Sequence, residues 1–387
     1  KDGKSLKSVQ DKISGNNTLS TLSSIDSNDE IVDNIYVVNL DSDKNSSMSA
    51  KAQAKNLKAT VEQVEKLPEV EYVEPVKTYR AFSNDVQTSY QWALKNLGKD
   101  EGVKDADIRN EKMQQLLGKR TVKDTTIAVV DTGVDNSLAD LKHHVRMDIG
   151  KNYVSQDSLP LDDNGHGTHV TGIIAAESNN GYSMEGINQH TKIMPVKVLD
   201  ADGSGDSEQI ANGIVYAANH GAKVINLSLG GEYSRTIEYA LKYAASKNVV
   251  IIAASGNDGQ FGLSYPASSQ YVISVGATNN FDIVSDYSNY GEKLDIVAPG
   301  TNIPSLVPNG NVTYMSGTSM ATPHVTAIAG LLLSGNSKLK VSEIRTLLHQ
   351  SADNVAFKEK DNEDASESLM DIIGSAMSEF DDFDLPV

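Results

Sequence analysis

Short runs of apolar residues, each followed by Gly, Ser, Asn or Asp, recur along the middle of the chain. They cover residues 126–130, 193–199, 224–227 and 249–254. Runs without polar alternation are typical of strands buried on both faces of a sheet. The apolar stretch at 325–333, the one that opens near residue 166, and the mixed apolar and polar stretch at 341–350 indicate helices instead. This alternation of buried strands and helices is typical of an α/β fold.

A smaller unit precedes this region. Residues 1–30 are rich in Ser, Asn, Lys and Asp, a composition that favours little fixed structure. Residues 35–40 and 70–76 are predicted strands, and residues 49–67 are a predicted helix with apolar side chains at every third or fourth position. The pattern therefore predicts a small α+β domain over residues 1–80, before a larger domain over residues 81–353.

Ser319 is the first candidate for chemistry. It lies between Gly317 and the predicted helix that contains residues 325–333. Free N–H groups and the helix dipole favour developing negative charge at a helix N-terminus. This place suits a nucleophile whose reaction forms an oxyanion. An ordinary N-cap is the simpler interpretation of such a turn when it is taken alone.

Two other segments supply the partners that a serine nucleophile needs. Asp131 follows the apolar run 126–130, and two histidines, His166 and His169, lie in the segment 164–172. A serine hydroxyl needs a base to remove its proton, and the imidazole needs an acid to fix its tautomer. An aspartate, a histidine and Ser319 can fill these roles in this chain order.

The three motifs, taken in order, resemble those of subtilisin-like serine proteases over roughly residues 86–353. The resemblance implies a subtilisin-like catalytic domain, in which helices flank a mostly parallel central sheet. It also implies Asp131, His166 and Ser319 as a catalytic triad, whose chemistry requires no cofactor. His169 and His324 are then structural residues.

The same resemblance implies an oxyanion site and a substrate site. Asn257, in the turn 255–259, would donate its side-chain N–H to the oxyanion beside the backbone N–H of Ser319. Two segments resemble edge strands that pair with an extended peptide through main-chain hydrogen bonds. Their implied substrate-binding residues are Gly203, Ser204, Gly205, Ser228, Leu229 and Gly230.

Specificity is predicted to favour basic substrates. By the resemblance, Asp258 lies at the mouth of the primary specificity pocket and Ser264 near its base. Further aspartates surround the neighbouring subsites, at Asp200, Asp202 and Asp206. Acidic rims favour basic peptides by electrostatic complementarity. The alternative is that aspartates occur at many positions in an acidic chain.

The N-terminal unit resembles the inhibitory propeptide of subtilases, which assists folding and leaves its C-terminal end in the active-site cleft. A generic small α+β adaptor domain is the alternative. The resemblance places the junction within residues 77–82, and the predicted cleavage lies between Arg80 and Ala81. An arginine there agrees with an acidic pocket, whereas cleavage after Tyr79 or Phe82 would contradict the prediction.

A structural calcium ion is the one metal that the resemblance implies. Asp140 and Asn180, the latter in the loop 178–184, match calcium-binding positions of many subtilisins. Calcium prefers hard oxygen ligands, many of them backbone carbonyls. The loop departs from the apolar pattern usual in the family, so both an occupied site and a metal-free loop stay open.

Composition restricts the partners and the compartment. The chain of 387 residues carries 52 acidic residues against 34 lysines and arginines, a net charge of −18, and this argues against nucleic-acid binding. Absence of cysteine excludes disulfides and thiolate sites. No apolar run approaches the roughly 18 residues that span a membrane. The polar start at Lys1 is interpreted as the result of trimming, with the export signal outside the sequence, and predicts a secreted or cell-surface protein.

The last segment, residues 354–387, contains two lysines and ten acidic residues and is predicted to be a solvated tail. The full pattern predicts a self-processing serine endopeptidase whose partners are its own propeptide and a peptide or protein substrate. The acidic pocket, the Arg80 junction and the lack of cysteine resemble lantibiotic leader peptidases of the epidermin-processing type, which cut a precursor after a basic residue. The alternatives are a broad degradative subtilisin and a proteolytically silent binding protein, and the intact triad argues against the latter.

Overall fold

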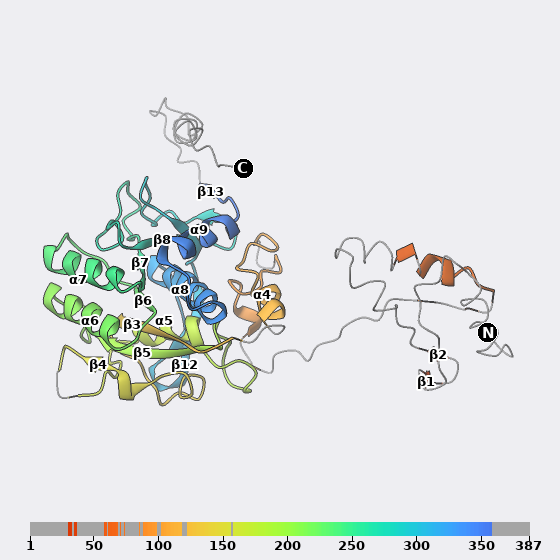
Figure 1. The fold of residues 1–387 in the computed structure, drawn as a ribbon, viewed down its shortest axis with the longest axis horizontal. Helices are drawn as coiled ribbons and strands as arrows, with labels where there is room; N and C mark the ends of the chain where they lie inside the picture. Colours follow the sequence, from red (N-terminus) through yellow and green to blue (C-terminus); the bar gives the residue numbers. More distant parts are fainter. Residues whose placement is uncertain are drawn as a thin grey trace, which may run out of the picture. The chain divides into compact units, whose positions relative to one another are not determined.

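The computed structural model divides the chain into two compact units, Lys1–Phe82 and Ser83–Val387 (Figure 1). It describes residues 30–32, 35–36, 58–59, 61–68, 70, 73, 85, 88–98, 102–117, 122–155 and 158–357. Three predictions fall wholly or mostly outside these residues: the cleavage site at Arg80 and Ala81, the strand at 70–76 and the acidic tail.

The first unit contains two short strands in its described part. β1 (Glu30–Val32) pairs antiparallel with β2 (Ile35–Tyr36), which begins where the sequence predicts a strand. Residues 58–59 and 61–64 are helical, inside the stretch predicted as a helix. These parts are consistent with a small α+β unit, and its role as a propeptide stays a prediction.

A mostly parallel sheet forms the centre of the second unit. Among the described residues its strands follow the order β13-β9-β8-β7-β6-β3-β5-β4, and β10 also pairs with β8. All these pairings are parallel except that of β8 with β9. The predicted subtilisin-like α/β fold is therefore confirmed. The strands are β3 (Thr125–Asp131), β4 (Lys151–Asn152), β5 (Thr191–Lys197), β6 (Val224–Leu227), β7 (Val250–Ala254), β8 (Ile273–Thr278), β9 (Ile283–Val284), β10 (Ile296–Pro299) and β13 (Ala356–Phe357).

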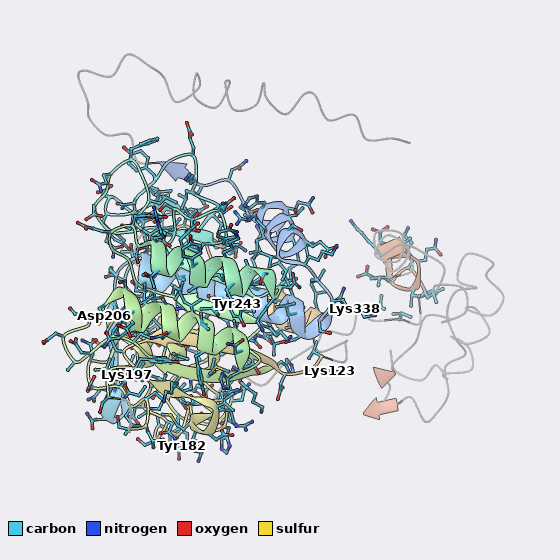
Figure 2. The ribbon with its side chains drawn as sticks, turned by 60° about the vertical axis from the view of Figure 1, so that its left-hand side comes forward. Lys123, Tyr182, Lys197, Asp206, Tyr243 and Lys338 are labelled. Atoms are coloured by element: carbon cyan, nitrogen blue, oxygen red, sulfur yellow. The ribbon has the colours of Figure 1, made fainter. Side chains whose placement is uncertain are left out.

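Helices cover both faces of this sheet (Figure 1). Ile127 and Val129 of β3 pack in one hydrophobic cluster with α5 (His166–Ala175) and α8 (Thr318–Gly335). Ala128 and Val130 pack in a second cluster with α6 (Ser207–Asn219) and α7 (Arg235–Ser246), which lie side by side in Figure 2. The strands are apolar at consecutive positions because both of their faces are buried.

The remaining elements lie around this core. They are α4 (Asn110–Leu117), α9 (Val341–Ser351), the antiparallel pair β11 (Ile303–Val307) and β12 (Asn311–Met315), and three short 3₁₀ turns, η2 (Thr88–Tyr90), η3 (Met147–Ile149) and η4 (Pro308–Gly310). No helix in the described part of the chain is long and apolar enough to cross a bilayer.

The sheet brings the candidate residues together. β7, β6 and β3 are neighbours and run parallel. Parallel neighbours end at the same edge of a sheet, where α/β proteins place their sites. Asp131 ends β3, and Ser228 and Ser255 directly follow β6 and β7.

Candidate active site

Asp131 and His166 form a hydrogen-bonded pair. The carboxylate of Asp131 is fully buried, and its Oδ1 accepts the Nδ1–H of His166 at 2.8 Å and the N–H of Thr132 at 2.7 Å. Burial alone lowers the pKa of His166, but the carboxylates of Asp131 and Asp162 outweigh it and leave this pKa above its usual value. The bond at Nδ1 leaves Nε2 as the nitrogen that can accept a proton.

Asp162 organises the turn ahead of His166, and sequence reasoning missed it. Its Oδ1 accepts the hydroxyl of Thr132 at 2.8 Å and the N–H of Gly165 at 2.9 Å. Its Oδ2 accepts the N–H of Thr168 at 2.9 Å. The carboxylate of Asp162 thus binds Thr132, which follows Asp131, together with Gly165 and Thr168 on the two sides of His166. Only its proximity to His166 in the sequence could have drawn attention to it.

Ser319 is anchored at the end of β6. Pro323 has no N–H, so it cannot donate the usual helical bond to the carbonyl of Ser319. The hydroxyl of Ser228 donates to this carbonyl at 2.7 Å, and the Oγ of Ser319 donates to the carbonyl of Ser228 at 3.2 Å. Among the described residues no hydrogen bond joins Ser319 to His166. A rotation of the Ser319 side chain is therefore needed before the histidine can take its proton.

Asn257 contacts the start of α8 through its side-chain amide. Its Oδ1 accepts the N–H of Thr318 at 2.8 Å and the hydroxyl of Thr318 at 2.9 Å. A backbone N–H can only donate, so the bond fixes which end of the amide is oxygen. The Nδ2 group lies on the side of Gly317, 3.4 Å from where a Cβ on that residue would stand. The N–H of Ser319, in the first helical turn, has no intrahelical partner. The two donors can face one developing oxyanion.

Asn289, a second residue that sequence reasoning missed, forms hydrogen bonds to both Asp258 and Ser264. The buried amide of Asn289 donates to Oδ2 of Asp258 at 3.2 Å and to Oγ of Ser264 at 3.5 Å. Its Oδ1 accepts the N–H of Asp258 at 2.9 Å. A Cβ on Gly256 would approach within 2.4 Å of this amide, so the glycine leaves room for the cluster. Asn289 is 31 residues from Asp258 in sequence, and no local signal marks it.

The two predicted substrate segments flank the site without forming strands. On one side, Ser228 contacts Ser319 as described, and Leu229 and Gly230 follow it. On the other side, Asn164 donates to the carbonyl of Ala201 at 2.9 Å and accepts the N–H of His166 at 3.1 Å. Gly203, Ser204 and Gly205 lie in this second segment and are exposed. The segment at residues 228–230 therefore borders Ser319, and the segment at residues 203–205 borders His166.

His169 and His324 are buried beside the site. Nε2 of His169 lies 3.1 Å from the carbonyl of Ile303, and Nδ1 of His324 lies 2.9 Å from the carbonyl of Met320. Burial lowers the pKa of each to about 4. Both rings are neutral near pH 7 and have their donor nitrogen on a carbonyl, which is a structural arrangement.

The predicted calcium residues lie together, with Asp85 as a further carboxylate that the sequence did not indicate. Oδ1 of Asp140 accepts the Nδ2–H of Asn180 at 2.8 Å, and Asp85 accepts the backbone N–H groups of Asn179 and Asn180 at 2.6 and 3.0 Å. Both aspartates are buried. The side-chain oxygen of Asn180, predicted as a ligand, instead accepts the N–H of Tyr182 at 3.0 Å.

These elements define a hydrolase site of the serine type: an aspartate–histidine pair and a serine at a helix N-terminus, beside a fixed amide donor. The subtilase family model matches residues 122–368, more than half of the chain. The chain belongs to this family of subtilisin-like serine proteases.

Individual relatives agree with this assignment. A cell wall-associated protease of Bacillus subtilis (strain 168) is 55% identical over 378 residues, which are 97% of this chain and 42% of that protein, so this chain spans about two fifths of that relative. Thermitase of Thermoactinomyces vulgaris is 44% identical over 59% of this chain and 81% of thermitase. The crystal structure of a cold adapted subtilisin-like serine proteinase matches with a TM-score of 0.57 at 33% identity, over 61% of this chain and 85% of the other.

Proposed function

We propose that the chain is a secreted or cell-surface serine endopeptidase that cleaves after basic residues. The observation that carries the proposal is the placing of Asp131, His166, Ser319 and Asn257 at the carboxyl ends of three adjacent strands. After the Ser319 side chain rotates, Nε2 of His166 takes the hydroxyl proton and Oγ attacks the scissile carbonyl. Asp131 stabilises the imidazolium that forms.

The remaining steps use the same groups. The N–H of Ser319 and Nδ2 of Asn257 donate to the oxyanion of the tetrahedral intermediate. His166 returns its proton to the leaving amine, and the acyl-enzyme forms. Water then attacks the ester with His166 again as base, and Ser319 recovers its proton as the product acid leaves. A peptide would lie extended between residues 203–205 and 228–230, paired with their backbone.

The preference for a basic residue rests on Asp258. The amide of Asn289 holds the carboxylate of Asp258 beside Ser264, and the Asp258 residue is exposed. A substrate lysine or arginine that enters between Asp258 and Ser264 would meet the negative charge of Asp258. Such a preference suits the processing of a precursor, for example a lantibiotic leader peptide, and it suits maturation between Arg80 and Ala81. Broad degradation is the second candidate, because an exposed carboxylate also leaves room for uncharged side chains.

Intact-mass analysis and N-terminal sequencing of the wild type and Ser319→Ala test maturation. We expect a wild-type fragment that starts at Ala81 and no such fragment in the variant. Normal processing of purified Ser319→Ala would contradict self-cleavage. Peptide libraries then compare the wild type with Asp258→Ser, and we expect the variant to lose its preference for arginine while it keeps cleavage after apolar residues. A wild type that cuts mostly after apolar residues would favour the degradative role.

We also propose a structural calcium ion at Asp85, Asp140 and the loop 178–184. Two buried carboxylates beside one loop fit a hard cation, although Asn180 must turn its amide to contribute its oxygen. A bound ion would hold this loop and would take no part in the triad chemistry. If calcium is about 100 times its Kd, it adds about 2.7 kcal/mol to the stability. Thermal unfolding of Ser319→Ala in calcium and in EDTA measures this difference. Asp140→Asn should abolish it, and equal melting temperatures in the parent protein would exclude the site.

A further inference from the structure

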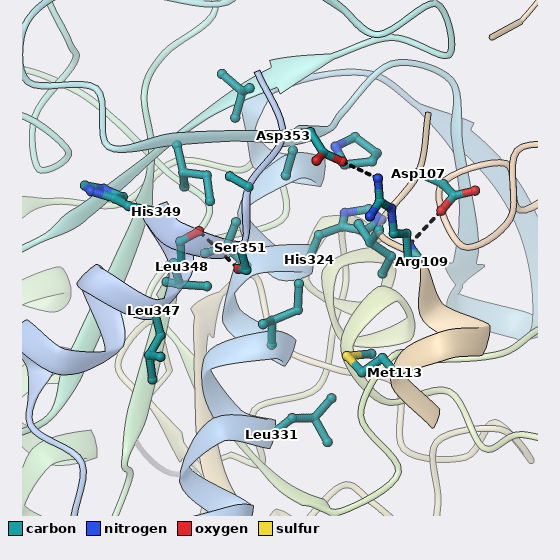
Figure 3. Close-up of a pocket in the computed structure, with 18 of the residues that line it drawn as sticks. Asp107, Arg109, Met113, His324, Leu331, Leu347, Leu348, His349, Ser351 and Asp353 are labelled. Atoms are coloured by element: carbon teal, nitrogen blue, oxygen red, sulfur yellow. Dashed lines mark hydrogen bonds and ion pairs between the residues drawn. The ribbon is translucent and has the colours of Figure 1, made fainter. Parts of the chain in front are cut away.

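A groove separate from the catalytic residues opens between α4, α8 and α9 (Figure 3). Its volume is about 1070 Å³. The lining is largely aliphatic and includes Met113, Ile328, Leu331, Leu332, Leu339 and Leu348. Leu116 on α4 and Leu347 on α9 also line it and are 56% and 37% exposed. Exposed leucines on two facing walls leave a large apolar surface in water, which is a mark of a docking site.

The chain itself leads into this groove. Residues 352–355, directly after α9, line the groove. Arg109 beside α4 donates to the carboxylate of Asp353 at 2.7 Å (Figure 3). β13 then pairs with β9, which holds Phe357 on the sheet. Residue 358, the first that the structure does not describe on this side, therefore starts close to the rim of the groove.

The sequence beyond residue 358 carries an apolar stripe. Leu369, Ile372, Ile373, Ala376, Met377 and Phe380 follow the spacing i, i+3, i+4, i+7, i+8 and i+11. This is the period of an amphipathic helix. Ser368, with Asp371 three residues later, is a typical N-cap signal, and the opposite face contains Asp371, Ser375 and Ser378. The stripe lies inside the segment whose acidic composition alone indicates a solvated linker.

We infer that residues 369–380 form a helix that docks its apolar stripe in the groove between α4, α8 and α9. A helix of 12 residues is about 18 Å long. The preceding residues 358–368 can extend about 35 Å, so the connection is long enough. The acidic residues on both sides of the stripe would keep the outer face of the docked helix in water.

Thiol labelling tests this docking, because the chain has no cysteine of its own. In the 387-residue chain with Ser319→Ala, Leu347→Cys reports on the groove, and Tyr243→Cys, which replaces a 39% exposed residue of α7, serves as the matched surface site. We expect Leu347→Cys to react with a maleimide at least about tenfold more slowly than Tyr243→Cys. Equal rates would overturn the proposal.

Paired charge variants identify the occupant. Ile372→Asp with Ile373→Asp should raise the labelling rate of Leu347→Cys to that of Tyr243→Cys. Ser375→Asp with Ser378→Asp adds the same charge on the polar face and should leave the groove protected. Emission of Trp92, the single tryptophan, should stay unchanged and show that the catalytic unit is folded. Protection that survives the isoleucine variants, or that rises with protein concentration and so indicates a second copy, would contradict docking of the tail.

Discussion

At the scale of single residues, Asp162 acts on the histidine from a distance. It does not contact the imidazole by a hydrogen bond, yet its carboxylate fixes Thr132 and the turn that carries His166, and it contributes to the raised pKa of His166. We expect Asp162→Asn to lower kcat by up to about 100-fold through misplacement of the base.

The pH dependence of kcat/KM distinguishes a role of Asp162 in positioning His166 from a general loss of structure in the variant. Loss of the Asp162 charge should lower the pKa of His166, so the acid limb of kcat/KM moves to lower pH. Asp148→Asn is the control, because it also removes one carboxylate, but from an exposed ion pair with Arg146. Profiles of kcat/KM across pH 4–9 check this. A reduced kcat with an unmoved acid limb would mean that Asp162 is only structural.

The residues that sequence could assign are those with a local pattern. The resemblance indicated Asp131, His166, Ser319 and Asn257 because each stands in a short motif at the end of a strand or the start of a helix, and the structure brings these motifs to one edge of the sheet. Asn289 and Asp85 are bound to segments far away in the chain. Their roles depend on tertiary contacts, and no spacing in the sequence encodes such contacts.

At the scale of elements, β6 has the bounds that the apolar run predicts, residues 224–227, whereas α8 begins seven residues before its predicted apolar stretch. Pro323 is the reason for the second difference. It normally ends or kinks a helix, since it cannot bond to the carbonyl four residues earlier. Here Ser228 donates to that carbonyl and the helix continues back to Thr318. A side chain on another element supplies the missing donor.

This compensation predicts a coupling between Ser228 and Pro323. Ser228→Ala should cost about 1 kcal/mol because the Ser319 carbonyl loses its donor. In a Pro323→Ala background the alanine N–H can bond to the same carbonyl, so the second substitution should cost much less. Denaturant unfolding of the four proteins, all carrying Ser319→Ala, gives the coupling free energy. Additive costs would show that the serine hydroxyl does not replace the missing helical bond.

At the scale of the whole molecule, the buried histidines set how stability depends on pH. The pKa values of His169 and His324 are about 4 in the folded protein, below the ordinary 6.5 of an unfolded chain. Between these values the unfolded state binds more protons, so the free energy of unfolding falls as pH decreases. The stability is fully present above pH 6.5 and is lost toward pH 4. Each histidine accounts for about 3 kcal/mol of this loss. His166 acts in the opposite sense, because its raised pKa stabilises the fold below pH 6.5 and this contribution disappears as pH rises through the folded value.

His324→Asn isolates one of these contributions, since the asparagine amide can still donate to the carbonyl of Met320 but cannot gain a proton. Urea unfolding of Ser319→Ala with and without this change, from pH 4 to pH 7.5, should show a pH slope smaller by about one proton in the variant. His143→Asn is the control, because the His143 side chain is 62% exposed. We expect this substitution at the surface to leave the pH slope unchanged. If His324→Asn also leaves the slope unchanged, the acid sensitivity of the protein has another origin, and the buried ring at the first turns of α8 is not kept neutral by the fold.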